Sequence, residues 1–477
     1  MKDTQFYING QWVDSIGGTA LEVIDPSTEK VLTSITLGSQ EDTDRAVDAA
    51  SQAFTSWSHS TKAERMDLLK AILHEYEKRS DDMASTISSE MGAPISLSRE
   101  SQTTAGSYHM EGFVSALETA SFDEPLHPDS PDQRLLLEPV GVCALITPWN
   151  WPMNQIALKV IPAIATGCTT VLKPSELSPL SGMLFAQILH DSGVPAGVFN
   201  LINGDGEGVG TQLSRHRDVA MVSFTGSSRA GIAISKNAAD TLKRVSLELG
   251  GKGANIVFAD AGANAIKRGV MRCFNNTGQS CNAPTRMLVE RSRYAEAVEQ
   301  AKAQAENTGV SVASEPGTHI GPLVSKMQFD KVQSLIKHAM EVDGATLVAG
   351  GPGKPDGCET GYFARPTVFA DCTNDMRIMR EEVFGPVLSI MPFDTEEEAI
   401  AIANDTDYGL TNYIETEDTE KAQRVARQLR SGMVDINGRG RSAGSPFGGY
   451  KQSGNGREGG RWGLDEFLEV KAVGGWQ

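Results

Sequence analysis

The sequence predicts an α/β protein whose largest domain is a doubly wound parallel sheet covered by helices on both faces. Between residues 141 and 260, short β-rich runs alternate with helical stretches, which is the pattern that strand–helix–strand units produce. A second alternation, from residue 250 to about 437, predicts another α/β domain. With 477 residues and 40% hydrophobic content, the chain can fill the cores of about three domains.

Charge and cysteine content narrow the classes of partner. The 43 basic and 61 acidic residues give a formal net charge of −18, which repels nucleic acid and anionic membrane surfaces. We therefore expect small-molecule partners. The six cysteines include no Cys-x-x-Cys pair and the eight histidines show no ligand spacing, so neither a disulfide framework nor a metal site is predicted.

No targeting or membrane segment is expected. The first residues lack a basic and apolar leader. The most apolar later stretch, 156–172, is interrupted by Lys159, Pro162 and Gly167, so it falls short of a membrane span. We expect a cytoplasmic protein.

The N-terminal part is predicted to begin with strands and to continue as helices. Residues 5–35 mix apolar runs with turn pairs such as Asn9-Gly10, which is typical of a small antiparallel region. Thr61 and Glu64 form a capping-box pattern, and apolar residues then recur at helical spacing. Residues 121–139 are polar and proline-rich, which favours a protruding strand element.

In the 141–260 region, the predicted strands are 142–146, 169–172 and 198–202, and the predicted helices are 155–165 and 180–189. Ligands of such sheets bind outside the carboxyl ends of the strands. Two junctions there offer backbone N–H groups to a pyrophosphate: the glycine run 204–210 and the turn 224–227. The glycine run could equally be a flexible turn, and Ser227 could be only a helix N-cap. No Gly-x-x-x-x-Gly-Lys-Ser/Thr motif occurs, so a nucleoside triphosphatase has little support.

The second region is predicted to contain strands at 255–258 and 285–289 and helices at 263–275, 294–306, 326–342 and 396–404. Cys281 lies between the first of these helices and the strand that follows it. The last forty residues carry a Phe-Gly-Gly turn that begins at Phe447 and an apolar, strand-like tail at 467–473.

Three stretches hold the residues that we expect to carry chemistry. Cys281 follows a glycine-broken turn, where a nucleophilic thiol can be presented, provided that the site lowers its pKa. Asn150, in the proline-stiffened turn 147–152, offers an amide that can hold an oxyanion. Glu248 ends an apolar strand before two glycines and can act as a base. Taken singly, each could be ordinary: a core cysteine, a turn asparagine or a solvated glutamate.

Together with their flanks, these stretches resemble the aldehyde dehydrogenase superfamily over nearly the whole chain and in one order. The resemblance also rests on Lys173-Pro174-Ser175-Glu176, Phe224-Thr225-Gly226-Ser227, Glu382-Val383-Phe384-Gly385-Pro386 and the stretch 446–454.

The resemblance implies a particular division of the chain. Residues 1–120 and 140–249 would form a Rossmann-like doubly wound cofactor-binding domain, and residues 250–447 an α/β catalytic domain. Residues 121–139 and 460–477 would form a small β oligomerisation flap, whose tail strand pairs with another subunit. The protein would then be a homodimer or a homotetramer.

The resemblance further implies oxidation of an aldehyde to the carboxylic acid. Cys281 would attack the aldehyde and form a thiohemiacetal, whose oxyanion Asn150 and the backbone N–H of Cys281 would hold. Loss of hydride to a nicotinamide would leave a thioester, which water activated by Glu248 would hydrolyse. Lys159 and Glu458 match positions that pass protons to and from the base.

The cofactor implied by the resemblance is NAD, with NADP possible. The residues expected to contact it are Thr147, Trp149, Lys173, Glu176, Gly206, Gly210, Phe224, Gly226, Ser227, Glu382 and Phe384. Lys173 and Glu176 would hold the adenosine ribose, and Gly226 and Ser227 the pyrophosphate. Glu382 would hold the nicotinamide ribose. A carboxylate at Glu176 would repel a 2′-phosphate, so NAD is expected to be preferred over NADP.

The resemblance also implies which residues line the aldehyde tunnel: Trp151, Gln155, Leu158, Ser280, Asn282 and Phe447. This wall holds no cation. Relatives that act on carboxylate-bearing semialdehydes tend to place arginine where this chain has Leu158. Relatives that act on quaternary ammonium aldehydes tend to place tryptophan there. We therefore expect uncharged aliphatic or aromatic aldehydes. The alternative is that a loop arginine such as Arg439 or Arg441 reaches in and supplies a charge.

Two other functions stay open at this point. In a CoA-acylating semialdehyde dehydrogenase, coenzyme A rather than water takes the acyl group, and Glu248 in its Glu-Leu-Gly-Gly context argues against that reaction. A catalytically idle structural relative would not need Cys281, Asn150 and Glu248 together.

Overall fold

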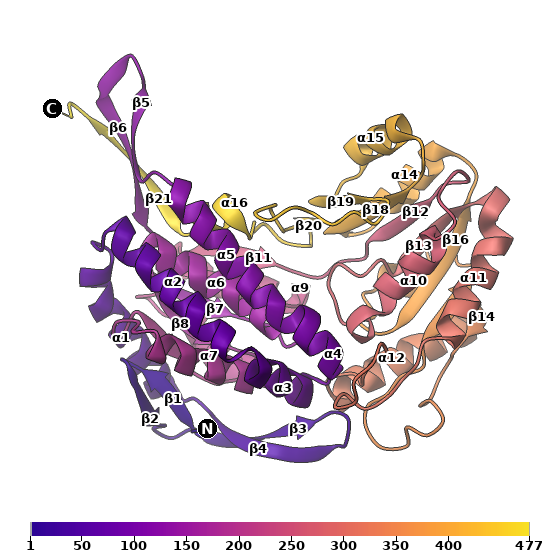
Figure 1. Cartoon of the computed structure of the whole chain (residues 1–477), viewed down its shortest axis with the longest axis horizontal. Helices are drawn as coiled ribbons and strands as arrows, with labels where there is room; N and C mark the ends of the chain where they lie inside the picture. Colours follow the sequence, from indigo (N-terminus) through magenta and orange to yellow (C-terminus); the bar gives the residue numbers. More distant parts are fainter. Residues whose placement is uncertain (1, 477) are drawn as a thin grey trace.

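The computed structural model describes residues 2–476; Met1 and Gln477, the outermost residues of the predicted domain segments, lie outside the described residues. Two lobes, each built on a seven-stranded sheet, lie side by side, and a thin three-stranded flap projects from the first lobe (Figure 1). Most neighbouring strands in the two large sheets are parallel. The predicted α/β class is therefore confirmed.

The chain begins with two antiparallel hairpins, as predicted. Strands β1 (Gln5–Ile8) and β2 (Gln11–Asp14) are joined by Asn9 and Gly10, whose φ angles of 50° and 77° suit a tight two-residue turn. Strands β3 (Thr19–Asp25) and β4 (Lys30–Leu37) form the second hairpin.

Helices of the first lobe follow: α1 (Gln40–Trp57), α2 (Lys62–Lys78), α3 (Ser80–Met91), the short α4 (Ile95–Leu97), the π-helical turn η1 (Ser98–Thr103) and α5 (Thr104–Thr119). The predicted capping box opens α2. The Thr61 hydroxyl accepts a hydrogen bond from the backbone N–H of Glu64, and the Glu64 carboxylate accepts one from the backbone N–H of Thr61 at 2.7 Å.

The flap consists of β5 (Asp123–His127), β6 (Ser130–Pro139) and the C-terminal strand β21 (Leu468–Gly474). The protruding strand element predicted at 121–139 is therefore present (Figure 1). The tail was expected to pair with another subunit. Within the chain, β21 pairs along the whole of its length with β6, because the last helix returns the chain to the base of β6, and β21 forms an edge of the flap sheet; pairing with another subunit stays a prediction.

The first sheet has the order β11-β10-β7-β8-β9-β1-β2. Its five parallel strands are β7 (Val142–Ile146), β8 (Thr169–Lys173), β9 (Phe199–Leu201), β10 (Met221–Thr225) and β11 (Arg244–Glu248). The chain winds outward from β7 to β9 and then returns to β10 on the other side of β7. Doubly wound sheets bind ligands at the carboxyl ends of the strands where the winding reverses, so the residues after β7 and β10 mark the expected site.

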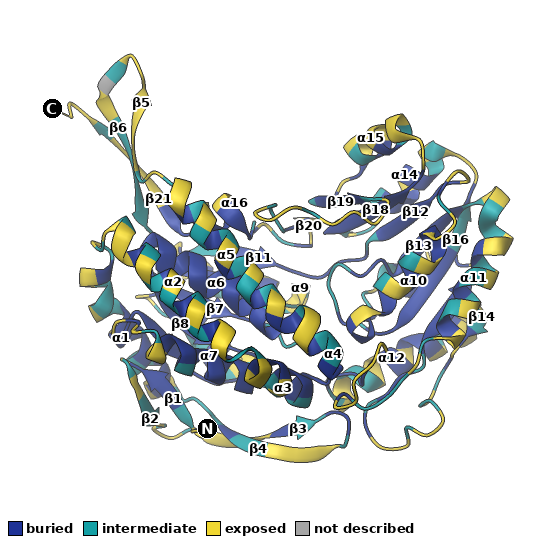
Figure 2. Ribbon diagram, in the orientation of Figure 1, coloured by how far each residue is buried: buried dark blue, intermediate teal, exposed yellow. Residues whose placement is uncertain are grey.

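Helices cover both faces of this sheet: α6 (Pro152–Thr166), α7 (Leu180–Asp191), the π-helical turn η2 (Gly206–Gly210), α8 (Thr211–Arg215), α9 (Ser228–Ala238) and the 3₁₀ turn η3 (Ala239–Thr241). Every residue of β7, β8 and β10 is buried (Figure 2). Strands buried on both faces carry continuous apolar runs, which is why the sequence pattern identified them.

The second sheet has the order β14-β15-β16-β13-β12-β18-β19. Its strands are β12 (Ala254–Val257), β13 (Arg286–Glu290), β14 (Thr346–Ala349), β15 (Thr367–Ala370), β16 (Val387–Phe393), β18 (Thr411–Glu415) and β19 (Met433–Ile436). Its helices and helical turns are α10 (Ala265–Phe274), η4 (Asn275–Gly278), η5 (Arg291–Arg293), α11 (Tyr294–Glu306), α12 (Lys326–His338), η6 (Ala339–Asp343), α13 (Arg377–Arg380), α14 (Glu396–Asn404) and α15 (Thr419–Gln428).

After β19 the chain returns to the first lobe. Strand β20 (Tyr450–Lys451) pairs with β17 (Tyr408–Gly409), Gly454 forms a bridge with Glu248, and helix α16 (Gly460–Asp465) packs against α5 and α6. A further bridge joins Phe447 to Glu458. The returning loop thus lies beside the end of β11.

No helix between residues 2 and 476 combines the length and the apolar character that crossing a bilayer requires. Over the same residues, no three histidine, cysteine or acidic side chains are grouped in a way that could hold a metal ion.

Candidate active site

Cys281 is presented by a turn with an unusual backbone. Asn276, Thr277 and Gly278 all have positive φ angles, of 52°, 58° and 70°. Such angles are uncommon for residues with a side chain and cost free energy unless the surroundings hold them. A Cβ atom at Gly278 would lie 2.0 Å from the Gly385 carbonyl oxygen, so only glycine fits there.

Buried side-chain amides hold this turn against the first lobe. Gln102, fully buried on η1, donates from Nε2 to the backbone oxygen of Asn150 at 3.0 Å and to Oδ1 of Asn276 at 3.3 Å. Asn276 donates from Nδ2 to the same Asn150 oxygen at 2.9 Å. The Gln279 side chain in turn accepts from the backbone N–H of Val324 at 3.0 Å. Since an unpaired buried amide is costly, this network makes the turn rigid.

Asn150 connects the two lobes at the turn. Its Nδ2 donates to the backbone oxygen of Gln279 at 2.9 Å. A side-chain amide carries two N–H groups, so a second donor remains next to the segment that ends in Cys281.

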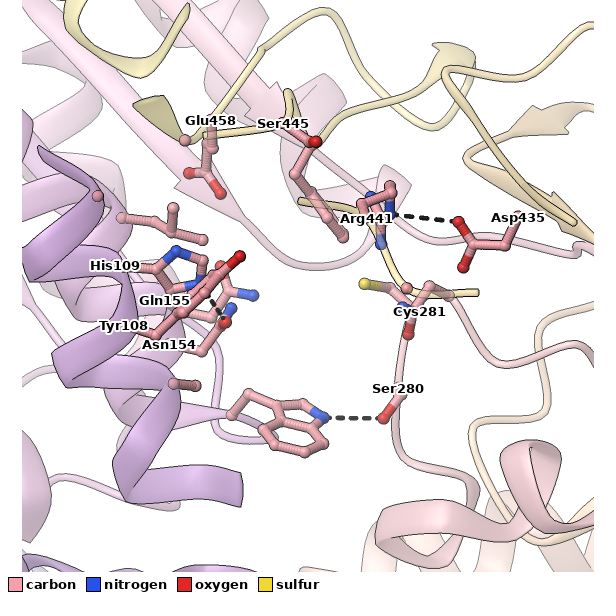
Figure 3. Close-up of a pocket in the computed structure, with 18 of the residues that line it drawn as sticks. Tyr108, His109, Asn154, Gln155, Ser280, Cys281, Asp435, Arg441, Ser445 and Glu458 are labelled. Carbon is pink, nitrogen blue, oxygen red and sulfur yellow. Dashed lines mark hydrogen bonds and ion pairs between the residues drawn. The ribbon is translucent and has the colours of Figure 1, made fainter. Parts of the chain in front are cut away.

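A cavity of about 440 Å³ opens at Cys281 (Figure 3). All six residues expected to line the aldehyde tunnel border it: Trp151, Gln155, Leu158, Ser280, Asn282 and Phe447. Trp151 donates from Nε1 to the Ser280 hydroxyl at 2.8 Å, which ties the wall from α6 to the Cys281 segment. The cavity also has lining residues without a predicted role, among them Tyr108, His109 and Asn154.

The expectation of a wall without a cation is wrong, because Arg272 and Arg441 both border the cavity. Arg272 comes from α10 and Arg441 from the loop after β19, so the packing of the second lobe rather than local sequence brings them together. Of the two loop arginines considered, Arg439 is exposed and is not among the residues lining the cavity.

Glu248 lies at the end of β11 and is only 2% exposed. Neither of its carboxylate oxygens has a hydrogen-bond partner among residues 2–476. Burial, together with the negative charge of Glu458, raises the pKa of the Glu248 carboxyl well above its usual value. The carboxylate does not itself border the cavity; its Oε1 lies beside Gly448 and Gly456 of the returning loop.

Lys159 and Glu458 form a buried ion pair close to Glu248. Lys159 is fully buried on α6, where its Nζ contacts Glu458 Oε1 and donates to the Thr225 hydroxyl at 2.7 Å. Glu458 also borders the cavity, so this pair lies between Glu248 and the open space.

The Cys281 thiol is protonated at neutral pH in this structure. Burial and the nearby carboxylates of Glu382 and Glu248 raise its pKa to about 12. The lowered pKa expected from the sequence is therefore not found, because acidic rather than basic side chains surround the thiol.

The residues expected to bind a cofactor gather at the carboxyl ends of the first sheet. Thr147 follows β7, and its buried hydroxyl has no partner within residues 2–476. Lys173, at the end of β8, donates to Glu176 Oε2 at 3.3 Å. Gly226 follows β10, and a Cβ atom there would lie 2.4 Å from the ring of Phe224. Gly206 and Gly210 bound η2, which follows β9.

The second lobe contributes the other expected cofactor contacts. Glu382 accepts a hydrogen bond at Oε1 from the backbone N–H of Gly251 at 2.8 Å. Phe384 meets Trp149 edge-on, with ring centres 5.3 Å apart, across the boundary between the lobes. The Ser227 hydroxyl caps α9 by accepting a hydrogen bond from the backbone N–H of Ala230, so its side chain acts as the helix N-cap considered from the sequence.

The edge of the first sheet fits a dinucleotide. It combines the unpaired N–H groups at the start of α9, a close-packed glycine at Gly226 and the unpartnered hydroxyl of Thr147. Sequence reasoning missed Gln102, since nothing local marks it. It also gave no role to Asn276 and Gln279, although amide side chains on both sides of Gly278 could have suggested a hydrogen-bonded turn.

Comparison with known proteins agrees with this geometry. The family model described as the aldehyde dehydrogenase family matches residues 12–473. A curated relative, 3-succinoylsemialdehyde-pyridine dehydrogenase from a Pseudomonas species, is 51% identical over 99% of this chain and 98% of its own. The crystal structure of an aldehyde dehydrogenase from Bartonella henselae is 57% identical, with a TM-score of 0.99 and 99% of each chain covered. A mutant of aldehyde dehydrogenase C from Pseudomonas syringae, complexed with NAD+ and octanal, is 46% identical with a TM-score of 0.98, covering 100% of this chain and 97% of that one.

Replacing Gly278 with alanine should destabilise the protein and displace Cys281. The left-handed backbone alone costs about 1–2 kcal/mol for a residue with a Cβ, and here the added Cβ also meets the Gly385 oxygen. We expect a lower thermal midpoint than for Gly344→Ala, which has a similar φ of 72° but no atom within 4 Å of the new Cβ. Thermal unfolding of both variants checks this, and equal midpoints would show that Gly278 is not sterically confined.

Proposed function

The chain belongs to the aldehyde dehydrogenase family, and from that premise we propose that it oxidises an aldehyde to the carboxylic acid through a covalent intermediate on Cys281. The observation that carries the proposal is the placement of Cys281. Its thiol borders the cavity directly after the rigid turn, and that turn is hydrogen-bonded to the Asn150 amide.

In the first step the Cys281 sulfur bonds to the aldehyde carbon, and the carbonyl oxygen becomes an oxyanion. The free N–H of the Asn150 amide and the backbone N–H of Cys281 hold this oxyanion. Donors placed in advance matter because the loss of one costs about 3 kcal/mol of transition-state stabilisation. The thiol proton leaves to solvent in the cavity as the bond forms, so that Glu248 stays available for the later water step.

NAD, when bound, accepts the hydride that leaves the tetrahedral carbon, which turns the thiohemiacetal into a thioester. The residues proposed to hold it are Thr147, Trp149, Lys173, Glu176, Gly206, Gly210, Phe224, Gly226, Ser227, Glu382 and Phe384. Support comes from the donor set at the carboxyl edge of the first sheet and from relatives whose structures contain NAD+.

In the last step water hydrolyses the thioester. Glu248 removes a proton from the water while the carbon–sulfur bond breaks and the thiol is restored. The raised pKa of Glu248 makes it a stronger base than an exposed glutamate. Lys159 and Glu458 lie beside it and would pass the proton onward to the cavity.

We propose aliphatic or aromatic aldehydes as substrates, uncharged along the part of the molecule that lies against the apolar wall. Leu158 offers neither a charge nor an aromatic face, and Trp151 and Phe447 supply apolar walls. Relatives support the choice, since one is named for a pyridine-bearing semialdehyde and another was crystallised with octanal.

We also propose a homo-oligomer assembled through the flap, where Leu126, Val470 and Trp476 are exposed.

Replacing Cys281 with serine should abolish aldehyde oxidation and leave NAD binding intact. A serine hydroxyl lacks the nucleophilicity of a thiolate and ionises far less readily than a thiol. NADH absorbance measures turnover, and titration of protein fluorescence with NAD measures binding. Turnover above a few per cent of the wild-type rate would show that another group is the nucleophile.

Replacing Glu248 with glutamine should slow the steady state but preserve an initial burst of about one NADH per site, because acylation precedes the water step.

In the wild type, the steady-state rate should rise as pH increases and the Glu248 carboxyl, whose pKa is raised, loses its proton. Rapid-mixing kinetics between pH 6 and 9, with and without coenzyme A, check both points. Loss of the burst would mean that Glu248 also activates the thiol, and stimulation by coenzyme A would indicate an acylating enzyme.

NAD should be used with higher kcat/KM than NADP, because the Glu176 carboxylate at the end of β8 repels a 2′-phosphate. The pairing of Glu176 with Lys173 reduces this repulsion without removing it. Glu176→Gln should lower the ratio of the two kcat/KM values. A wild-type ratio near one, or a ratio that does not change in the variant, would contradict the assignment.

A further inference from the structure

Two arginines share one buried carboxylate on the wall of the cavity. Asp435, at 3% exposure, contacts Arg272 Nη2 through Oδ2 and lies 3.4 Å from Arg441 Nε through Oδ1. One carboxylate balances one guanidinium, so the cluster keeps one positive charge in excess. The side chains of Arg272 and Arg441 are 30% and 28% exposed, whereas Asp435 is buried, so the excess positive charge faces the cavity, where it can recognise a ligand.

No other acidic group on the described part of the cavity wall balances this charge. The remaining carboxylate that lines the cavity belongs to Glu458, and it is already paired with Lys159. The one histidine on the wall, His109, hydrogen-bonds Asn154 at 2.8 Å, and burial lowers its pKa, so it is neutral near pH 7.

Arg441 is the member of the cluster placed to meet a ligand. The Arg272 guanidinium lies over the ring of Tyr413, 4.3 Å from the ring centre, so one of its faces is covered by protein. The Arg441 guanidinium lies 5.6 Å from the ring centre of Phe447, which is itself part of the wall. Figure 3 shows Arg441 on the same side of the cavity as Cys281, opposite Tyr108 and His109.

Resting on the aldehyde oxidation proposed above, we propose that Arg441 is a specificity residue that binds a second oxygen acceptor carried by the aldehyde, either a ketone or a carboxylate. A guanidinium carries five N–H donors, and Asp435 engages only some of them. A substrate oxygen that pairs with a remaining donor forms a charge-assisted hydrogen bond. A substrate without such an oxygen displaces solvent from that donor and gives it no partner in exchange, so sites that hydrogen-bond a substrate group discriminate against analogues that lack it.

The test compares three aldehydes of similar length: hexanal, 4-oxohexanal and succinate semialdehyde. Arg441→Met removes the guanidinium and keeps an apolar stem, while Asp435 retains Arg272 as its partner. Arg439→Met is the matched control, because Arg439 lies two residues earlier in the same loop and is exposed. We expect the wild type and the control to favour at least one acceptor-bearing aldehyde over hexanal in kcat/KM. In Arg441→Met that ratio should fall by about tenfold or more.

The two acceptor-bearing aldehydes distinguish two ways in which Arg441 can recognise the substrate. A preference for 4-oxohexanal supports recognition by hydrogen bonding, and a preference for succinate semialdehyde supports recognition through the excess charge. An acceptor preference that is absent, or that survives in Arg441→Met, overturns the inference while leaving the proposed oxidation standing. Failure of the wild type to oxidise any of the three would overturn the proposed function, and this inference with it.

Discussion

The hydrogen bond from the Asn150 side chain to the Gln279 backbone is the contact on which the site depends. Asn150 follows a strand of the first sheet, whereas Gln279 belongs to the turn that ends at Cys281 in the second lobe. The turn has three successive positive φ angles and would not hold that shape alone. Gln102 and Asn276 both donate to the Asn150 backbone, so the same buried amides fix the thiol and the proposed oxyanion donor. The proposed nucleophile and the proposed oxyanion donor are thereby positioned as one unit.

Burial controls the charge state of the reacting groups. It raises the pKa of the Cys281 thiol and of the Glu248 carboxyl; the charges of Glu382 and Glu248 add to the first effect, and the charge of Glu458 adds to the second. A resting site with a protonated thiol is protected from premature reaction, and a carboxyl of raised pKa is suited to take a proton near neutrality. The buried Lys159–Glu458 pair beside Glu248 links this carboxyl to the cavity. The proposed hydrolysis can therefore pass its proton along these side chains to the cavity.

The cavity wall gives the substrate two kinds of environment. Trp151 and Phe447 are apolar, whereas the Arg272–Asp435–Arg441 cluster brings one excess positive charge to the same space. An apolar wall discriminates weakly among aldehydes, since a methylene contributes about 1–3 kcal/mol, but buried donors discriminate strongly. The cluster that we propose to govern substrate choice is assembled from residues that no single segment of the sequence contains.

The sequence by itself determined the fold class and many of the elements, and it supplied the residues that we propose carry chemistry. The strand at 142–146 and the helices at 294–306 and 396–404 end where expected, because apolar periodicity and turn residues act locally. Cys281, Asn150 and Glu248 stand in short motifs, so they could be named without coordinates. Only the tertiary structure decided the pairing of the tail with β6, the link between Gln102 and Asn150, 48 residues apart, and the meeting of Arg272 with Asp435, 163 residues apart. It also reversed the expected direction of the Cys281 pKa shift, because desolvation and neighbouring charge arise from packing between distant segments, which local pattern does not encode.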